Sequence, residues 1–387
     1  MEFDVIVVHY GEVTLKRSKR GLFEKILARN LEKSSGMKVK RLQGRLIIEL
    51  TPKADLTSLL DKIGKVFGVV WYAPAIKVKT VEDLQERIVK ILRGLKVNKI
   101  GIETRRSDKS FPMTSLEISK IVGAHLSASL GVKIDLKNPE KKVFIEVTED
   151  GIYASFERLR GPGGLPIGSS GKVLCLFSGG IRSWLACWYI MKRGCSVDLL
   201  HIYNASSPDR FLEAAAHLIN KLLEYSMKFR LYLIPFNIVL KILEEVPENM
   251  RETVFKIYLH KIGEKIAERR RYPGLVSGYT IGLDQVRFNE LYLLLSLRKL
   301  PIYTPLIALD ESEIINRARS LRLPEIPGEE YLDPAEYLRK NFGTAEVDRD
   351  RVKDYLKKLK LDDAVERSMS DLQVLELKFG EKLKPKT

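Results

Sequence analysis

Cysteine is scarce in this sequence. The 387 residues include three cysteines, and all of them lie in one short stretch, at Cys175, Cys187 and Cys195. They have neither paired C-x-x-C spacing nor neighbouring histidines, so the sequence predicts neither a zinc site nor a disulfide framework. We therefore predict no metal-binding residues.

Long apolar runs are missing as well. No uninterrupted apolar stretch reaches the roughly 18 residues that a membrane-spanning helix needs. Met1 is followed directly by EFDVIVVHY, which is strand-like and contains no basic leader. We therefore expect a soluble, cytoplasmic protein with no membrane partner.

The length and composition are those of a folded, modular protein. At 387 residues the chain exceeds the size, roughly 250 to 300 residues, at which a single core stops growing. A hydrophobic content of 45% beside 30% charged residues excludes a disordered chain. We expect two or three domains.

Positive charge is concentrated in the first half of the sequence. Residues 1–171 hold 31 Lys and Arg against 20 Asp and Glu, which is +11 of the total formal charge of +16. Such asymmetry favours a polyanionic partner, because contacts to phosphates release condensed counterions. A thermophilic type of surface, rich in lysine and glutamate, is the alternative. Packed domains rather than an amphipathic anchor are expected here, which favours nucleic acid over an acidic membrane surface.

Periodicity divides the first half into two α+β units. Residues 1–78 show the order β-α-β-α-β, with strands expected at 3–9, 45–50 and 69–78 and helices at 20–33 and 56–68. Residues 79–160 show the order α-β-α-β-β, with helices expected at 82–95 and 113–130. The Gly- and Pro-rich stretch GPGGLPIGSSG at 161–171 predicts a linker between this half and the next.

Strands alternate with helices over residues 172–333. The strand-like runs are KVLCLF, SVDLLHIYN, LYLIPF and GLVSGY, and helices are expected near 183–194, 250–270 and 285–298. This alternation predicts a doubly wound parallel sheet with helices on both faces. Residues 334–387 are highly charged and include the periodic VKDYLKKLKL, so we expect them to form a helical tail appended to this domain.

The loop that follows the first of these strands has a pattern with chemical meaning. KVLCLFSGGIRS at 172–183 places small residues between a buried strand and a helix. Glycines let the backbone approach an anion, Ser178 and Ser183 offer hydroxyls, and the helix N-terminus adds amide donors and positive potential. The pattern predicts a phosphate cradle. An ordinary tight strand-to-helix turn is the alternative, because glycine pairs after strands are common.

Four segments, in this order along the chain, form a wider pattern. They are HYGEVTLKRSKRGLFEKIL at 9–27, RRSDKSFPMTSLEIS at 105–119, DLKNPEKKVFIEV at 135–147 and GPGGLPIGSSGKVLCLFSGG at 161–180. Together they resemble the tRNA 4-thiouridine synthetases, or tRNA sulfurtransferases. The resemblance implies a multidomain α/β protein with a ferredoxin-like domain at 1–78, a THUMP RNA-binding domain at 79–160 and a PP-loop domain at 172–333.

The resemblance also implies an activity and partners. In this family the THUMP domain helps to grip the acceptor end of tRNA, and the PP-loop domain uses ATP with Mg²⁺ to adenylate a tRNA uridine before a persulfide sulfur displaces AMP. A homodimer and a sulfur donor or second subunit are further expected partners. For RNA we predict contacts from Lys16, Arg17, Lys19, Arg20, Arg105, Arg106 and Lys109. For the nucleotide we predict Ser178, Gly179, Gly180, Arg182, Ser183, His201 and Gly278.

Each of these assignments has a plainer alternative. The seven cations could be solvated surface charges, although Arg105, Arg106 and Lys109 fall inside the segment that is most like the family. His201, at the end of the second strand of the PP-loop domain, could be a buried and satisfied histidine rather than an adenine contact.

Two departures from the family pattern lie at the nucleotide site. The family's loop reads SGGxDS, and Arg182 stands where the aspartate belongs, which removes a potential metal ligand. In GYTIGLDQVRF at 278–288, the polar positions of the family are replaced by Leu283, Val286, Arg287 and Phe288, and Asp284 or Gln285 could compensate only if the loop shifts.

A third departure concerns the sulfur. The family carries a cysteine near the end of the PP-loop domain, but the matching stretch here is EEYLDPAEYL at 329–338, and no cysteine follows Cys195. We predict that Cys175 and Cys187 are core residues and that Cys195, in a turn, is the exposed thiol.

Two functions are therefore compatible with the sequence. One is a tRNA-binding relative, active in tRNA modification, whose site for adenylation and sulfur transfer is degraded. The other is an active 4-thiouridine synthetase that tolerates Arg182 and receives sulfide directly. The three departures favour the first.

Overall fold

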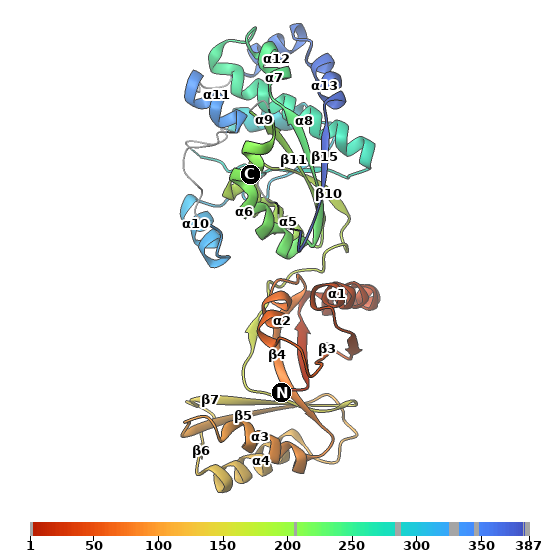
Figure 1. Ribbon diagram of the computed structural model, residues 1–387, viewed down its shortest axis with the longest axis vertical. Helices are drawn as coiled ribbons and strands as arrows, with labels where there is room; N and C mark the ends of the chain where they lie inside the picture. The colour runs from red at the N-terminus through yellow and green to blue at the C-terminus, as the bar shows by residue number, and fades with distance from the viewer. Residues whose placement is uncertain are drawn as a thin grey trace. The chain divides into compact units, whose positions relative to one another are not determined.

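Two separate sheets organise the chain in the computed structural model (Figure 1). One belongs to unit 1, Met1–Pro166, and the other to unit 2, Ile167–Thr387. The structure describes residues 3–204, 207–282, 288–324, 333–343, 348–381 and 383, apart from the side chain of Arg17. Among these residues, no helix is long and apolar enough to cross a membrane.

Unit 1 is one mixed sheet with helices packed on it. Its described strands are β1 (Val5–Tyr10), β2 (Val39–Leu42), β3 (Arg45–Glu49), β4 (Val69–Val78), β5 (Lys99–Arg106), β6 (Lys133–Ile134), β7 (Lys141–Thr148), β8 (Gly151–Ser155) and β9 (Leu159–Arg160). Its helices are the 3₁₀ helix η1 (Glu12–Lys19) and the α-helices α1 (Arg20–Ser35), α2 (Leu56–Ile63), α3 (Val81–Leu92) and α4 (Ser115–Leu130). The strand order is β2-β3-β1-β4-β8-β7-β5-β6, and β9 pairs with β4.

The first part of unit 1 has the β-α-β-β-α-β order of a ferredoxin-like domain. Alternation along β1 explains the layers: Ile6 and Val8 join the core beneath α1 and α2, whereas Val5 and Val7 lie in a separate cluster on the other face. The sequence analysis missed β2, because its residues VKRL are only partly buried and show no apolar alternation.

The second part of unit 1 continues the same sheet. Strand β4 pairs antiparallel with β8, and β5 pairs in parallel with β7. Helices α3 and α4 lie side by side on one face of the sheet, α3 against β4 and β8 and α4 against β5 (Figure 1). Thr114 begins α4 with a capping box, accepting the amide of Glu117 while Glu117 accepts the amide of Thr114. The amphipathic periodicity predicted from the sequence therefore forms the helical layer.

Unit 2 is a mostly parallel sheet between two helical layers. Its described strands are β10 (Lys172–Leu176), β11 (Ser196–Tyr203), β12 (Lys228–Pro235), β13 (Leu275–Val276), β14 (Ile302–Tyr303) and β15 (Gln373–Lys378). Its described helices are α5 (Ile181–Lys192), α6 (Asp209–Ser226), α7 (Asn237–Leu243), the 3₁₀ helix η2 (Glu248–Met250), α8 (Arg251–Arg270), α9 (Phe288–Ser296), α10 (Glu311–Ser320), α11 (Pro334–Phe342), α12 (Arg349–Lys358) and α13 (Leu361–Ser370). The strand order is β14-β13-β10-β11-β12-β15, and only β15 runs antiparallel to its neighbour in this described sheet.

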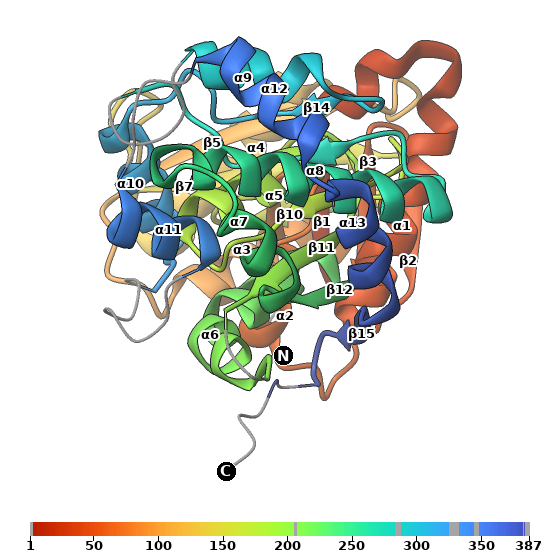
Figure 2. The same ribbon diagram turned by 90° about the horizontal axis from the view of Figure 1, so that it is seen from above.

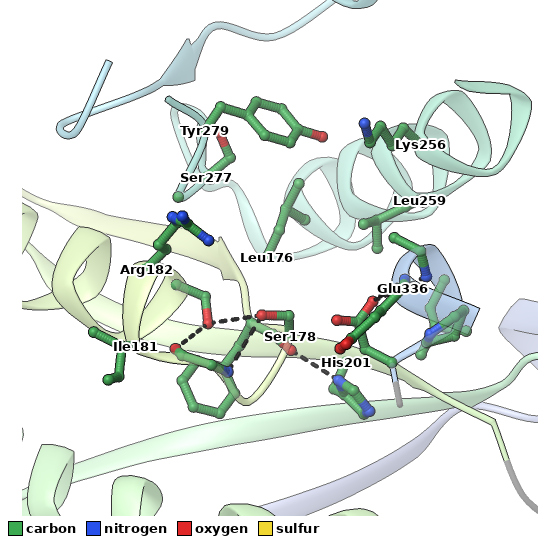
Figure 3. Close-up of a pocket in the computed structure, with 18 of the residues that line it drawn as sticks. Leu176, Ser178, Ile181, Arg182, His201, Lys256, Leu259, Ser277, Tyr279 and Glu336 are labelled. Atoms are coloured by element: carbon green, nitrogen blue, oxygen red, sulfur yellow. Dashed lines mark hydrogen bonds between the residues drawn. The ribbon is translucent and has the colours of Figure 1, made fainter. Parts of the chain in front are cut away.

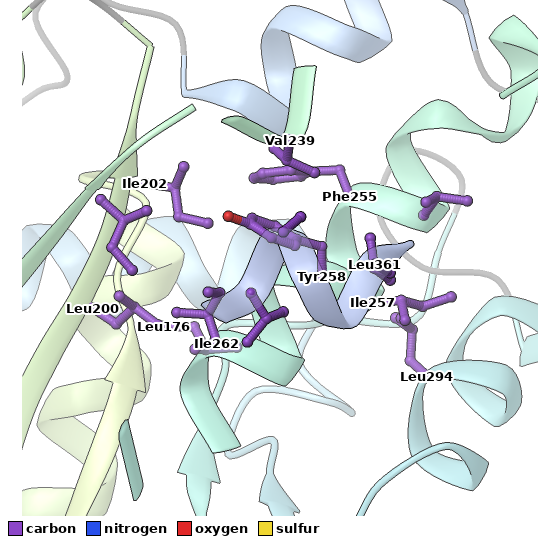
Figure 4. Packing of buried hydrophobic residues seen from close by; sticks show 14 of the residues in the cluster. Leu176, Leu200, Ile202, Val239, Phe255, Ile257, Tyr258, Ile262, Leu294 and Leu361 are labelled. Atoms are coloured by element: carbon purple, nitrogen blue, oxygen red, sulfur yellow. The ribbon is translucent and has the colours of Figure 1, made fainter. Parts of the chain in front are cut away.

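Both faces of this sheet are covered. Leu174 and Leu176 of β10 join the large apolar cluster that contains α7, α8 and α13. Figure 4 shows this packing, with Leu176 beside the residues of α8. Cys175 points to the other side, where its thiol is hydrogen-bonded to Cys187 of α5. Because the strands are parallel, the carboxyl ends of β10, β11 and β13 meet at one edge, which is where ligands bind in such sheets.

The charged tail is not an appendage, so that prediction is wrong. Strand β15 pairs with β12 from Gln373 to Lys378 and extends the sheet (Figure 2). Helices α11 to α13 contribute buried side chains to the main cluster of unit 2, among them Leu338, Val352 and Leu361. The high charge of residues 334–387 is typical of a solvated tail. A narrow apolar stripe is nevertheless enough to pack such short helices against a core.

Candidate nucleotide pocket

The loop after β10 is organised by its two serines. The Ser178 hydroxyl donates to Ser183 Oγ over 3.1 Å, and the Ser183 hydroxyl donates to the Gly180 carbonyl over 2.9 Å. The Gly180 amide in turn donates to Ser178 Oγ over 3.3 Å. Gly179 has φ +92°, in the left-handed region, and a Cβ there would lie 3.0 Å from Cε2 of Phe211. These contacts fix the path of the loop into α5.

Helix α5 starts with uncapped amides. Its N-cap residue is Gly180, which has no side chain that could accept the amides of the first turn. The positive end of the helix dipole and these donors favour an anion at this position. The predicted phosphate cradle stays a prediction, and the uncapped start of α5 is compatible with it.

A second backbone segment packs closely on the start of α5. A Cβ on Gly278 would lie 2.8 Å from both the carbonyl carbon of Arg182 and the amide nitrogen of Ser183. Only glycine fits so close to backbone atoms that cannot move aside. Gly278 thus sets the position of the segment after β13 against the loop.

A pocket of about 420 Å³ opens at this edge of the sheet (Figure 3). Its walls come from the loop and the start of α5, the ends of β11 and β13, and helices α8, α10 and α11. Six of the seven predicted nucleotide residues line it, namely Ser178, Gly180, Arg182, Ser183, His201 and Gly278. Gly179 shapes the loop without lining the pocket. The structure thus brings the predicted residues together, and their role in binding stays a prediction.

Arg182 forms an ion pair across the mouth of the pocket. Its Nη2 atom is hydrogen-bonded to Oε2 of Glu311, the first residue of α10. The Arg182 side chain is 34% exposed and that of Glu311 is 59% exposed, so water reaches both partners. The residue that replaces the family's aspartate is therefore neutralised by a glutamate that lies 129 positions further along the chain.

A buried ionic network forms another wall of the pocket. Lys256 Nζ lies 3.0 Å from carboxylate oxygens of Glu252 and Glu290, and Arg339 Nη2 lies 2.8 Å from Glu252 Oε1. Burial alone would raise the pKa of Glu252, but Lys256 and Arg339 together hold it below its ordinary value. Lys256 is thus held by carboxylates of the protein itself.

His201 is buried and neutral. It is 2% exposed and its ring stacks on Phe211, with the ring centroids 3.4 Å apart. Burial lowers the pKa of His201 to about 3, although a hydrogen bond of 2.8 Å between Nδ1 and the Phe177 carbonyl opposes this effect. With Nδ1 donating, the imidazole supports the loop at Phe177 while it lines the pocket.

None of the three cysteines lines the pocket. Cys175 and Cys187 lie in the core, as predicted. The prediction that Cys195 is exposed is wrong, since this residue is only 8% exposed and its Sγ contacts the Ser170 carbonyl at 3.6 Å. The turn that contains Cys195 packs against the start of unit 2, and burial raises the pKa of both the Cys195 and the Cys175 thiols.

Two of the residues predicted to bind RNA, in η1 and α1, form ion pairs with glutamates four positions away. Lys16 forms an i,i+4 pair with Glu12 at 3.6 Å, and Arg20 Nε donates to Glu24 over 2.6 Å. Lys19 is exposed. The Arg17 side chain lies outside the described part of the structure, so its prediction is untested.

The RNA candidates of the THUMP segment differ in their surroundings. Arg105 has a 68% exposed side chain that pairs with Glu103 at 3.1 Å, and Lys109 is exposed. Arg106 instead donates from Nη1 to the carbonyls of Phe111 and Met113, both at 2.9 Å. Arg106 therefore supports the loop that follows β5, a role that its sequence did not reveal.

Several pocket residues were not predicted from the sequence. They include Lys256, Ser277, Tyr279, Glu311, Asp333 and Arg339. Ser277 and Tyr279 flank the predicted Gly278, and Asp333 lies in the stretch 329–338, but no local pattern singled them out. Lys256, Glu311 and Arg339 come from helices that are distant in sequence from the loop. The predicted departures at Leu283, Val286 and Arg287, with Asp284 and Gln285, lie outside the described residues, whereas Phe288 begins α9 and is 71% exposed.

A glycine-containing loop between a parallel strand and an uncapped helix, with a pocket at the carboxyl edge of the sheet, defines an α/β protein of the PP-loop nucleotide-binding class. Family comparison agrees: the model described as "Thiamine biosynthesis protein (ThiI)" matches residues 168–361, the ThiI ferredoxin-like domain matches 5–73 and the THUMP domain matches 78–157. The chain belongs to the tRNA sulfurtransferase (ThiI) family. The predicted family and fold class are confirmed.

Relatives and solved structures cover most of the chain. The "Probable tRNA sulfurtransferase" of Brevibacillus brevis is 32% identical over 339 residues, which is 84% of each chain. That of Finegoldia magna is 33% identical over 330 residues, covering 82% of this chain and 84% of the relative. A 4-thiouridine synthetase solved with RNA and bound ATP has the same fold, with a TM-score of 0.87 at 24% identity, covering 97% of this chain and 100% of its own.

The close approach at Gly278 yields a prediction. Gly278→Ala should lower the free energy of unfolding by about 1 to 3 kcal/mol, because the new methyl group would force the Arg182 and Ser183 backbone away. Gly282→Ala is the matched control, since a Cβ there meets no atom of the described residues within 4 Å. Urea unfolding of both variants measures the difference. Equal stabilities would contradict the close packing.

Proposed function

We propose that this chain is a tRNA-binding member of the tRNA sulfurtransferase family that acts in tRNA modification without itself performing the adenylation and sulfur-transfer chemistry. The observation that carries the proposal is the ion pair of Arg182 with Glu311 at the mouth of the nucleotide pocket. It occupies the position where the family's loop has an aspartate able to hold a metal ion. A guanidinium cannot ligate a cation, so this function of the loop is lost.

The described donors of the pocket also suit Mg²⁺ poorly. Among the described residues, no group of three or more His, Cys, Asp or Glu side chains could hold a metal ion. Glu311 pairs with Arg182, and Asp333 accepts the amides of Ala335 and Glu336 at the start of α11. Adenylation with release of pyrophosphate depends on a metal ion that neutralises the charge developing on the phosphates.

Sulfur transfer has no suitable thiol in this chain. A persulfide carrier needs an accessible sulfur of thiolate character. The sequence holds three cysteines, all three are buried, and burial raises the pKa of the thiols of Cys175 and Cys195. This supports a protein that leaves the sulfur step to another molecule.

Binding of tRNA is supported by the THUMP domain and by the charge of unit 1. Arg105 lies at the end of β5 and Lys109 lies in the following loop, which Arg106 holds in shape, and both cations are exposed to solvent. Contacts of this kind bind phosphates and set the register of the RNA without reading bases. We propose the acceptor end of tRNA as the ligand, by analogy with the family.

An active 4-thiouridine synthetase is the second candidate. The observation in its favour is the intact cradle of Ser178, Gly180 and Ser183, with Gly278 packed against it. An enzyme of this kind would receive sulfide directly, since its own thiols are buried.

A single assay separates the two candidates. The full chain is incubated with unmodified tRNA, labelled ATP, Mg²⁺ and sulfide, and the Brevibacillus brevis relative serves as positive control. We expect no tRNA-dependent pyrophosphate and no 4-thiouridine from this chain, because Arg182 replaces the metal ligand. Release of pyrophosphate alone would contradict the proposal that this chain does not adenylate tRNA. Formation of 4-thiouridine would establish the second candidate, an active synthetase.

The RNA surface yields a further prediction. Arg105→Ala with Lys109→Ala should weaken tRNA binding and reduce the slope of log affinity against log salt by roughly 1.5, because two phosphate contacts are removed. Lys357→Ala with Lys358→Ala, two exposed lysines of α12, is the matched control. Filter binding at several salt concentrations measures both. An unchanged slope in the first double variant would move the RNA surface elsewhere.

A further inference from the structure

The Arg182 guanidinium is paired with Glu311 but does not use all of its hydrogen-bond donors in that contact. Arg182 extends from the first turn of α5 and lines the pocket (Figure 3). Its guanidinium pairs with Glu311 of α10. Its Nε atom is buried and has no hydrogen-bond partner among the described residues. The guanidinium therefore has donor capacity beyond the contact with Glu311.

Ser277 supplies an independent sign that a polar ligand is missing. It directly follows β13, lines the same pocket, and is only 2% exposed. Its hydroxyl has no hydrogen-bond partner within the described part of the chain. A buried hydroxyl without a partner is costly, which is why such groups are normally satisfied. Ser277 and Arg182 line the same pocket, and Gly278, the residue after Ser277, packs on the Arg182 backbone, with an added Cβ at 2.8 Å from its carbonyl carbon.

The carboxylates of the pocket are already engaged. Glu311 is paired with Arg182, Asp333 caps α11, and Glu336 lies 3.4 Å from Lys340. A divalent cation would have to displace these partners and approach a guanidinium. The donor set thus disagrees with the metal-assisted phosphate binding expected of the family.

We infer that Arg182 itself binds a nucleotide phosphate in place of a metal ion, displacing Glu311, so that the pocket takes a nucleoside triphosphate without a divalent cation. This inference rests on the nucleotide pocket of the proposed function. The pair with Glu311 is half-exposed and screened by water, so it is weak. A phosphate offers Arg182 two oxygens and a higher charge, and the α5 amides and the Ser277 hydroxyl add further donors.

Glu311 then acts as an internal competitor for the phosphate. It keeps Arg182 neutralised while the pocket holds no anion, and its removal leaves the cation open to the ligand. The substitution Arg182→Asp alone would bring the new carboxylate close to that of Glu311, and the two like charges would repel each other. Position 311 is therefore a specificity-determining partner of position 182.

Titration of the full chain with ATP tests the inference. Isothermal calorimetry is performed in Mg²⁺ and again in EDTA. The wild type should bind with equal affinity, within about twofold, in both. Arg182→Ala should bind at least about tenfold more weakly, the loss expected for a charge-assisted contact. Glu311→Gln should bind about two- to fivefold more tightly, because an exposed competitor is gone. Arg269→Ala, an exposed arginine outside the pocket, should behave as wild type.

The contrary outcomes are distinct. Binding that needs Mg²⁺, or that is unchanged in Arg182→Ala, would overturn the inference and leave the nucleotide pocket standing. An absence of binding by the wild type in both buffers would overturn the nucleotide pocket as well. Circular dichroism of each variant confirms that a loss of binding is not a loss of folding.

Discussion

The close approach of two backbone segments at Gly278 is the constraint on which the pocket depends. It holds the segment after β13 against the first turn of α5, where the backbone of Arg182 and Ser183 leaves no room for a side chain. The serine contacts within the loop then orient the uncapped amides of α5 toward the same space. This chain thus keeps the framework of an anion site.

The pocket of this chain differs from the family pattern in the charge of its side chains. Arg182 puts a cation where the family has a metal ligand, and Glu311 balances it from α10. Lys256 and Arg339 are balanced in the same way by Glu252 and Glu290. All three cysteines are buried and none of them lines the pocket, so the pocket has no thiol of its own to carry sulfur.

Much of the fold could be predicted from the sequence, because apolar periodicity marks helices such as α2 and α3, whose buried residues recur at helical spacing. Strand β15 could not, since its burial alternates weakly and its partner β12 lies far away in the chain. In the site, the loop around Ser178 was predicted from local chemistry. Glu311 was not, because its significance comes from a contact that only the folded chain creates.

The central claim is that this chain does not make 4-thiouridine. The most direct measurement is the 4-thiouridine content, by mass spectrometry, of tRNA from a host that lacks its own 4-thiouridine synthetase and expresses this chain. Such a host supplies its own sulfur donors and unmodified tRNA. The account predicts that the nucleoside is absent, while expression of the Brevibacillus brevis relative restores it. Its appearance with this chain would contradict the claim and establish an active enzyme.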